Sequence, residues 1–207
     1  MFTGIVAAVG TITSITSSGN QADAGTRLSV DAGGLPLADV AIGDSIAMNG
    51  ACMTVVAKTD AGFTVDVSRE SLHRTAGLDA LGEVNLEKAL TLADRLGGHL
   101  VSGHVDGLGI VRKFEPVAES WELLIEAPTE LAKFLAYKGS VVVNGVSLTV
   151  NRVTDTATGC EFSINLIPHT IEVTTLKHLK VDAKVNLEID LIARYVERML
   201  SLSNTVK

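Results

Sequence analysis

The chain contains two copies of one sequence unit. The stretch IAMNGACMTVV at residues 46–56 aligns without a gap with VVVNGVSLTVN at residues 141–151. Two further pairs keep the same order: TGIVAAVG with SGHVDGLG upstream, and VNLEKAL with VNLEIDL downstream. The repeat is roughly 100 residues long, far more than the roughly 20–50 residues of solenoid or propeller repeats. Each copy is therefore expected to form a small domain rather than a structural tile.

The composition favours compact β-barrels. Of the 207 residues, 4% are aromatic and 19 are glycine, and β-branched residues that pack well on a pleated surface are frequent. An Asn-Gly pair lies between apolar runs in each copy, at Asn49 and Asn144, and predicts a tight hairpin turn. Alternating apolar and polar residues predict strands with one buried face at residues 26–32, 62–68, 121–127 and 159–167. The predicted fold class is mainly β, with two tandem barrels.

Short helices are expected to interrupt the barrels. One candidate covers residues 87–96 and is ended by Gly97 and Gly98, and a second covers residues 128–139 with Pro128 near its start. The joint between the barrels is expected to follow Gly98. The predicted units are therefore an N-terminal barrel over 1–98, a C-terminal barrel over 99–189 and a tail over 190–207.

The tail predicts a longer helix. Over residues 190–204 the apolar side chains of Ile192, Val196, Met199 and Leu200 recur at helical spacing, which is more apolar surface than one solvated helix needs. Two interpretations stay open: the stripe packs on its own domain, or it mediates self-association around a symmetry axis. We favour self-association, because two finished barrels leave such a helix no partner within them.

The charge and the cysteines exclude several classes of protein. A formal net charge of −7 argues against a nucleic-acid partner, which needs a basic patch. No apolar run is long enough to span a membrane, and the first residues lack the pattern of a secretory signal. Cys52 and Cys160 lie at non-equivalent positions of the two copies, so a structural disulfide is not expected and a cytoplasmic location is.

Motifs for nucleotides, metals and serine hydrolases are missing. GLGIVR at residue 107 fails the dinucleotide pattern, and neither GxxxxGK[ST] nor GxSxG occurs. His99 and His104 are five residues apart with only Asp106 as a third ligand, so we expect no metal.

What remains is a set of polar residues on apolar strands. We interpret them as equivalent positions of the two copies: Cys52, Thr54 and Ser68 in the first, and Ser147, Thr149 and Thr170 in the second. Each residue taken alone is usually structural. Taken as pairs they indicate two similar pockets for two molecules of one ligand, or for two similar ligands, and the cysteine-to-serine difference indicates that the pockets are used differently.

His104 is a further candidate. Ile5 stands at the equivalent place of the first copy, so the barrel itself does not require a histidine there. His104 follows Gly103, where a backbone can approach a ligand closely, and an imidazole can give or accept a proton near neutral pH. A structural role stays open for this residue.

Five motifs together resemble one family. MFTGIV at residue 1, NGACMTV at 49, GGHLVSGHVDG at 97, KGSVVVNGVSLTVN at 138 and LIPHT at 166 are similar to riboflavin synthase of the α-chain type, from residue 1 to about residue 195. The resemblance implies two six-stranded Greek-key barrels, a C-terminal helix and a cytoplasmic homotrimer. It implies that the enzyme, a transferase, dismutates two molecules of 6,7-dimethyl-8-ribityllumazine to riboflavin and 5-amino-6-ribitylaminouracil, with no metal or organic cofactor. It also raises lumazine synthase as a partner.

The resemblance assigns site residues, with the site between the N-terminal barrel of one subunit and the C-terminal barrel of its neighbour. The catalytic candidates are Cys52, Ser147, His104 and Asp190. The N-terminal pocket would comprise Gly4, Ile5, Val6, Cys52, Met53, Thr54, Asp66, Val67, Ser68, Arg69, Glu70 and Ser71. The C-terminal pocket would comprise Gly103, His104, Val105, Lys138, Val146, Ser147, Leu148, Thr149, Leu166, Ile167, Pro168, His169, Thr170 and Ile171.

One departure from the family pattern and two alternative functions qualify the resemblance. Many members of the family have aspartate where this chain has Asn144, so no carboxylate base is expected at that position. A non-catalytic lumazine or flavin carrier of the same fold is the main alternative function. A barrel of a flavin-dependent reductase would require a nucleotide domain that this sequence lacks.

Overall fold

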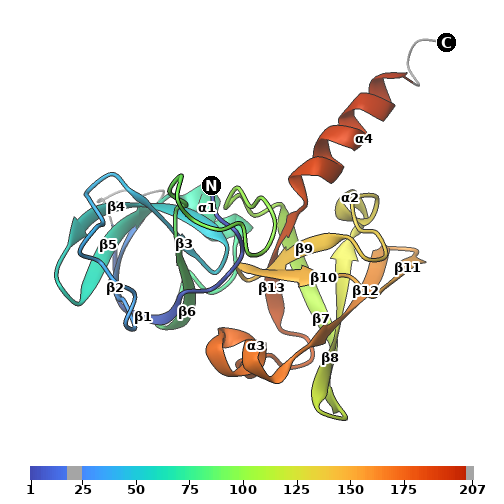
Figure 1. The fold of residues 1–207 in the computed structure, drawn as a ribbon, viewed down its shortest axis with the longest axis horizontal. Helices are drawn as coiled ribbons and strands as arrows, with labels where there is room; N and C mark the ends of the chain where they lie inside the picture. Colours follow the sequence, from blue (N-terminus) through green and yellow to red (C-terminus); the bar gives the residue numbers. More distant parts are fainter. Residues whose placement is uncertain (18–24, 204–207) are drawn as a thin grey trace.

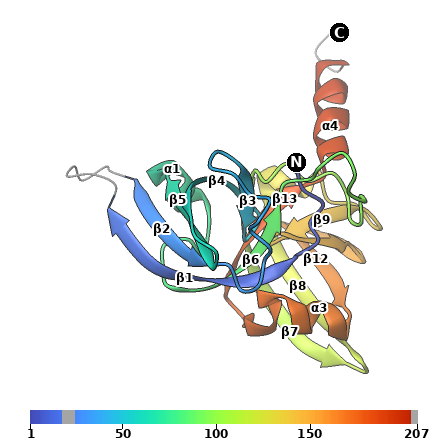
Figure 2. The ribbon, with the colours of Figure 1, turned by 60° about the vertical axis from the view of Figure 1, so that its left-hand side comes forward.

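The computed structural model describes residues 1–17 and 25–203. Two β-rich lobes lie side by side, and a single long helix projects from the second lobe (Figure 1). The same arrangement, with the helix pointing away from both lobes, is seen after rotation (Figure 2). No helix in the described part of the chain is long and apolar enough to cross a membrane.

The first lobe is a closed six-stranded barrel in the order β1-β2-β5-β4-β3-β6. Its interior is filled by alternating strand residues such as Leu28, Val30, Val55 and Val65, all nearly inaccessible to solvent. The strands are β1 (Ala8–Ser17), β2 (Thr26–Asp31), β3 (Ser45–Met48), β4 (Ala51–Lys58), β5 (Gly62–Val67) and β6 (Gly82–Lys88), and the short helix α1 (Arg69–Arg74) follows β5.

The second lobe is a curled sheet in the order β10-β9-β13-β7-β8-β12-β11. The strands are β7 (Gly107–Val117), β8 (Ser120–Pro128), β9 (Ser140–Val143), β10 (Val146–Thr149), β11 (Arg152–Thr156), β12 (Gly159–Leu166) and β13 (Lys184–Ile189). Short helical segments α2 (Thr129–Ala132), α3 (Pro168–Val173) and η1 (Thr175–His178) interrupt it, and α4 (Leu191–Ser203) ends the described chain.

The second lobe has seven strands because the counterpart of β4 is interrupted. β10 pairs with β9 as β4 pairs with β3, and β11 pairs with β12 as β4 pairs with β5. The interruption falls at residues 150–151, where β4 has a register shift between Val55 and Ala57. β10 and β11 are the two edges of the curled sheet, and residues 150–151 connect them directly. Within this connection, Asn151 N donates to Ser163 O of β12 at 2.8 Å. The mainly β fold with two tandem repeats is confirmed, and the fourth of the six strands expected in the second copy is divided in two.

Both predicted hairpin turns are present and they meet between the lobes. Asn49 and Gly50 have φ of 46° and 84°, and Asn144 and Gly145 have φ of 47° and 82°, as a tight turn with two left-handed residues requires. A Cβ built on Gly50 would lie 2.9 Å from Gly145 N. The two turns therefore pack against each other at the contact between the lobes.

Asparagine side chains join the lobes in a reciprocal pattern. Asn85 Nδ2 donates to Asn144 O at 2.8 Å, and its counterpart Asn186 Nδ2 donates to Asn49 O at 2.9 Å. Within each lobe, Asn49 Oδ1 accepts from Asn85 N and Asn144 Oδ1 accepts from Asn186 N. The duplicated sequence thus produces a contact with approximate two-fold symmetry inside one chain.

The helix predictions have mixed outcomes. A helix over 87–96 is wrong: Glu87 and Lys88 belong to β6, where they pair with Ala47 and Ile46 of β3 to close the barrel, and turns follow. Over 128–139 only α2 is α-helical. The tail helix is confirmed as α4, although Asn204 and the residues after it lie outside the described part of the chain.

Candidate functional site

The two copies exchange the segments that precede their barrels. Cys52 N on β4 donates to Gly103 O of the second copy at 2.8 Å, and Ser147 N on β10 donates to Gly4 O of the first copy at 2.7 Å. Phe2 and Val101 form an isolated antiparallel bridge between the two segments. Each candidate nucleophile therefore faces the backbone of the other copy.

This exchange corrects the grouping of residues expected from the sequence. Val6 packs against the core of the second lobe, and Val105 packs against the core of the first. Residues 4–6 thus lie with Ser147, and residues 103–105 lie with Cys52. The alternation of a strand predicts its buried face, but it carries no signal for which copy a connecting segment covers.

Glycine is required at the point of each exchange. Gly4 and Gly103 have φ of 75° and 80°, a region that favours glycine. A Cβ on Gly4 would lie 2.7 Å from Ser147 Cβ, and a Cβ on Gly103 would lie 2.7 Å from Cys52 Cβ. Glycine at these two positions therefore permits the positive φ and leaves room for the backbone to lie against Ser147 and Cys52.

Two buried carboxylates, which sequence reasoning missed, hold these segments in place. Glu87 on β6 accepts hydrogen bonds from Thr3 N, Thr3 Oγ1 and Gly4 N at 2.7, 2.7 and 2.9 Å. Its counterpart Glu188 on β13 accepts from the backbone N–H groups of Ser102, Gly103 and His104 at 2.6, 3.0 and 3.1 Å. The repeated VNLE sequence around both residues was a signal that could have found them.

The environment of these carboxylates shifts their titration. Glu87 is 8% exposed and Glu188 is 3% exposed. Burial raises the pKa of both carboxyl groups, although the hydrogen bonds that they accept act in the opposite direction. The cost of burying each carboxylate is offset by these hydrogen bonds, which hold the segment that reaches across to the other lobe.

A cavity of about 390 Å³ lies beside Cys52. Its size falls within the range of small-molecule pockets, which are roughly 300–1,000 Å³. Its wall combines residues of β4, α1 and the exchanged segment: Ala51, Cys52, Met53, Glu70, Ser71, Arg74, Thr75, Gly103, His104, Val105 and Asp106. The structure thus brings together Cys52 and His104, which the family resemblance assigned to different pockets.

The helices α1 and α3 occupy equivalent places, which corrects one predicted pair. α1 begins at Arg69 and α3 at Pro168, so the counterpart of Thr170 is Ser71 and not Ser68. Ser68 caps α1, since its Oγ accepts from Ser71 N at 3.0 Å. Ser71, and not Ser68, lines the Cys52 cavity.

Ser147 has surroundings of its own. His99 Nδ1 lies 2.8 Å from Ser147 Oγ, and a Cβ on Gly98 would lie 2.8 Å from Ser147 Cβ. The pKa of His99 is lowered by burial, and the charge of Asp190 acts against that shift. Asp190 Oδ1 accepts from Ile192 N at 2.8 Å, so this predicted catalytic residue caps the start of α4 on the His99 side.

The remaining predicted residues divide by position, and their part in binding stays a prediction. The side chains of Val67, Val146, Leu148, Leu166 and Ile171 belong to the two cores or pack against them. The exposed residues among those predicted include Ile5, Thr54, Arg69, Thr149, Ile167, Pro168 and His169. Asp66 is bound by Arg27 through two hydrogen bonds, and Lys138, which has φ of 63°, donates to Asn151 Oδ1.

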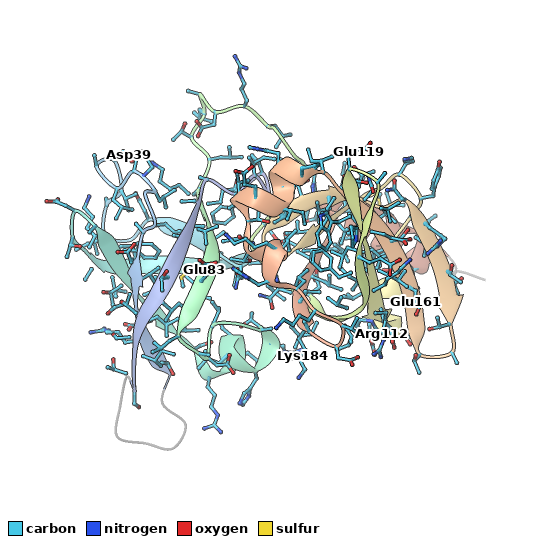
Figure 3. The ribbon with its side chains drawn as sticks, turned by 90° about the horizontal axis from the view of Figure 1, so that it is seen from below. Asp39, Glu83, Arg112, Glu119, Glu161 and Lys184 are labelled. Atoms are coloured by element: carbon cyan, nitrogen blue, oxygen red, sulfur yellow. The ribbon has the colours of Figure 1, made fainter. Side chains whose placement is uncertain are left out.

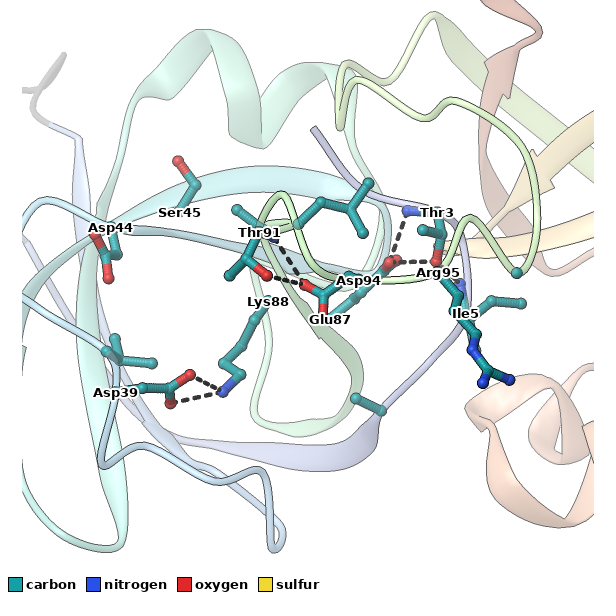
Figure 4. A pocket seen from close by; sticks show the side chains of 15 residues that line it. Thr3, Ile5, Asp39, Asp44, Ser45, Glu87, Lys88, Thr91, Asp94 and Arg95 are labelled. Carbon is teal, nitrogen blue, oxygen red and sulfur yellow. Dashed lines mark hydrogen bonds and ion pairs between the residues drawn. The ribbon is translucent and has the colours of Figure 1, made fainter.

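A second, larger hollow of about 750 Å³ lies on the first lobe (Figure 4). Several of its charged groups are engaged with neighbours: Lys88 pairs with Asp39 at 2.7 Å, and Asp94 accepts from Thr91 N and Oγ1. Glu87 forms part of its wall. The hollow therefore borders the Gly4 segment on the side of the first lobe.

The described residues contain no group of three or more His, Cys, Asp or Glu side chains that could hold a metal ion. Acidic side chains such as Asp39, Glu83 and Glu161 are spread over both lobes (Figure 3).

Asn144, where a carboxylate base was in question, serves the turn and the contact between lobes instead.

Comparison with known proteins agrees with this geometry. The family model described as lumazine binding domain matches twice, at residues 3–89 and 102–190. Riboflavin synthase of Photobacterium phosphoreum is 48% identical over 202 residues, which cover 97% of this chain and 89% of the relative. Riboflavin synthases of Mycobacterium bovis and Bacillus subtilis are 44% and 40% identical, over 97% and 100% of this chain and 98% and 93% of theirs.

Solved structures share the fold. The crystal structure of LumP complexed with riboflavin has a TM-score of 0.79 and 25% sequence identity, over 91% of this chain and 99% of that one. LumP complexed with 6,7-dimethyl-8-(1'-D-ribityl) lumazine has a TM-score of 0.77 and 24% identity, over 91% of this chain and 98% of that one. Two lumazine-binding repeats and full-length relatives named for one enzyme lead to a single conclusion: the chain belongs to the riboflavin synthase family and is an enzyme of the transferase class.

Proposed function

We propose that the chain dismutates two molecules of 6,7-dimethyl-8-ribityllumazine by moving a four-carbon unit from one to the other. The products are riboflavin and 5-amino-6-ribitylaminouracil. The reciprocal exchange carries the proposal, because Cys52 and Ser147 are placed by the same kind of backbone bond to a glycine of the other copy. Two sites with one backbone frame suit two molecules of one ligand.

The residue types at the two sites fit the steps of this reaction. The C7 methyl group of the lumazine is acidic because the ring delocalises the anion, so a proton must leave it, and a nucleophile must add at C7 of the acceptor molecule. Thiol, hydroxyl and imidazole groups serve such steps, and Cys52, Ser147 and His104 supply them. Holding two ligands together raises their effective concentration, which would lower the activation barrier by several kcal/mol, and by about 7–11 kcal/mol in the best cases.

The proposal includes a homotrimer in which the N-terminal barrel of one protomer faces the C-terminal barrel of the next. The units 1–98, 99–189 and 190–207 would then be two lumazine-binding barrels and an oligomerisation helix. The apolar side chains of α4 support self-association, since Ile192 is 67% exposed and Leu200 is 61% exposed. A cytoplasmic location, independence from metals and organic cofactors, and lumazine synthase as a partner belong to the same proposal.

The stoichiometry of the reaction tests the function. The purified chain is incubated with the ribityllumazine and no additive, and riboflavin is followed by absorbance while both products are quantified by chromatography. The expected result is one riboflavin and one 5-amino-6-ribitylaminouracil for every two lumazines consumed. Tight binding of the lumazine without consumption would contradict the proposal.

A non-catalytic carrier is the second candidate, and one observation favours it. The solved structures reported above are of LumP bound to riboflavin or to the lumazine. A carrier would bind either compound without converting it, so the same incubation separates the two functions. Both copies of this chain keep their polar site residues, Cys52 in one and Ser147 in the other, which favours catalysis.

A further inference from the structure

His99 distinguishes the Ser147 site from the Cys52 site. Its Nδ1 lies 2.8 Å from Ser147 Oγ, and its backbone N–H donates to Thr3 O at 3.2 Å. At the Cys52 cavity the imidazole of the lining is His104, whose counterpart in the first copy is Ile5. The two sites therefore receive their imidazoles from different positions of the repeat.

The surroundings of the His99 ring indicate where its proton lies. Nε2 is buried and has no hydrogen-bond partner among the described residues. A buried N–H without an acceptor is rarer in proteins than an acceptor atom without a donor. The favoured tautomer therefore carries its hydrogen on Nδ1, which then donates to Ser147 Oγ, and leaves a bare lone pair on Nε2. Burial lowers the pKa of the ring, in keeping with an uncharged imidazole at neutral pH.

We propose that His99 is a positioning residue for Ser147: its Nδ1–H fixes the serine oxygen, and the hydroxyl hydrogen of Ser147 is thereby left to donate to an acceptor atom of the bound heteroaromatic ligand. Gly4 and Gly98 enclose the Ser147 side chain on two sides, which restricts its rotamers further. The inference rests on the proposed function, which places a ligand beside Ser147 and names it. It assigns Ser147 the role of a directed hydrogen-bond donor, whereas the imidazole that lines the Cys52 cavity is His104.

The tautomer is tested without reference to activity. Long-range ¹H–¹⁵N correlation spectra of the intact protein at neutral pH identify which ring nitrogen of each histidine is protonated, and loss of one signal set in His99→Asn assigns His99. The expected pattern is a protonated Nδ1 and an unprotonated Nε2. The opposite tautomer, or a doubly protonated ring at neutral pH, would overturn the proposal.

Matched substitutions test the consequence for the ligand. His99→Asn places an amide donor near the position of Nδ1, whereas His99→Leu places none there. The dissociation constant of the ribityllumazine, measured by fluorescence titration, is expected to rise about tenfold in His99→Leu, the size of one hydrogen bond, and less than about threefold in His99→Asn. Equal losses in the two variants would count against positioning through a hydrogen bond.

A double-mutant cycle shows whether the effect runs through the serine. In a Ser147→Ala background, His99→Leu is expected to add little further loss of ligand affinity. An undiminished loss in that background would contradict the proposal. His178→Asn is the matched control, since His178 is an exposed histidine that contacts Glu83. Failure of riboflavin formation by the wild type would refute the proposed function, while the spectra and titrations would still decide the role of His99.

Discussion

At the scale of single residues, the two sites share a frame and differ in the reactive group. Cys52 and Ser147 both follow an Asn-Gly turn, and both use their backbone N–H to bind a glycine carbonyl of the other copy. A thiolate is a stronger nucleophile than a hydroxyl group, which needs a neighbouring base to act as one. The two sites are therefore suited to different steps of one reaction between identical molecules.

Removal of either reactive group is expected to affect turnover more than binding. In Cys52→Ala and in Ser147→Ala, kcat should fall by about 100-fold, the lower range for loss of a group that acts in proton transfer or addition, while lumazine affinity should fall less, by about tenfold in Ser147→Ala. Stopped-flow turnover and fluorescence titration measure the two quantities. Cys52→Ser is the conservative comparison and should retain part of the rate. Parallel losses of rate and affinity would contradict a chemical role.

Glu87 predicts a pH dependence of stability with a definite sign. Because burial raises its pKa in the folded state, its contribution to stability is present below the ordinary glutamate pKa of about 4.3 and is lost as pH rises through the raised folded value. The difference in unfolding free energy between wild type and Glu87→Gln should therefore decline as pH rises above about 4.3. Urea unfolding at a series of pH values measures this difference, with the exposed Glu119→Gln as a control for loss of one carboxylate. A difference that grows over the same pH window would contradict the assignment.

Duplicated side chains could be predicted from the sequence, but their partners could not. Cys52 and Ser147 were identified because unlike residues stand at one position of an otherwise repeated motif. Glu87 and His99 were missed: the repeated VNLE sequence does not indicate what Glu87 binds, and the contact of His99 with Ser147 spans 48 residues. Such a contact depends on the exchange between copies, which leaves no periodic signal in the sequence.

At the scale of elements, two hairpin turns form the centre of the molecule. The Asn-Gly turns of β3–β4 and β9–β10 abut, and Asn85 and Asn186 cross between them. The same hairpins carry Cys52 and Ser147 two residues beyond each turn. The distance between the two sites within one chain is therefore set by the packing of these turns.

Substitution of Gly50 tests that packing. Gly50→Ala should cost about 1–2 kcal/mol for a side chain at positive φ, and about 1–3 kcal/mol more because its Cβ would meet Gly145 N of the other lobe. Gly34→Ala is the matched control, since Gly34 also has positive φ but no atom within 4 Å of the added Cβ. Denaturant unfolding of both variants separates the two costs, and equal destabilisation would contradict the turn-to-turn contact.

The elements that could be predicted are those whose local pattern agrees with the fold. The strand β5, with alternating burial, and the turn at Asn49 followed from residue type and periodicity alone. The helix expected over 87–96 failed because closure of the barrel requires Glu87 and Lys88 in β6, and this long-range pairing outweighs local helix propensity. The division of one strand at residues 150–151 likewise has no local signal.

At the scale of the whole molecule, α4 is the element that one chain leaves uncovered. Two ion pairs fix its position, Arg194 with Asp106 at 2.7 Å and Lys133 with Glu197 at 2.6 Å. Its apolar side chains Ile192, Tyr195 and Leu200 are more than 60% exposed. Because Asp106 also lines the Cys52 cavity, α4 connects the surface proposed for assembly with a candidate site.

Removal of residues 191–207 is expected to abolish self-association. Sedimentation equilibrium should give three times the 21.7 kDa chain mass for the full chain, and the mass of a single chain for the truncated one. The single substitution Ile192→Lys should weaken association by placing a charge within the apolar face, whereas Glu197→Gln removes an ion pair and should leave association largely intact. An unchanged mass after truncation would contradict the role of α4.

Occupancy of the two sites tests the central claim most directly. A crystal structure of the full chain with bound riboflavin, which is a product and therefore does not turn over, should show one ligand beside Cys52 and His104 and a second beside Ser147 and His99. Each ligand should contact the segment contributed by the other copy, residues 103–106 in the first case and residues 3–6 in the second. A single occupied site, with the other filled by protein side chains, would contradict the account.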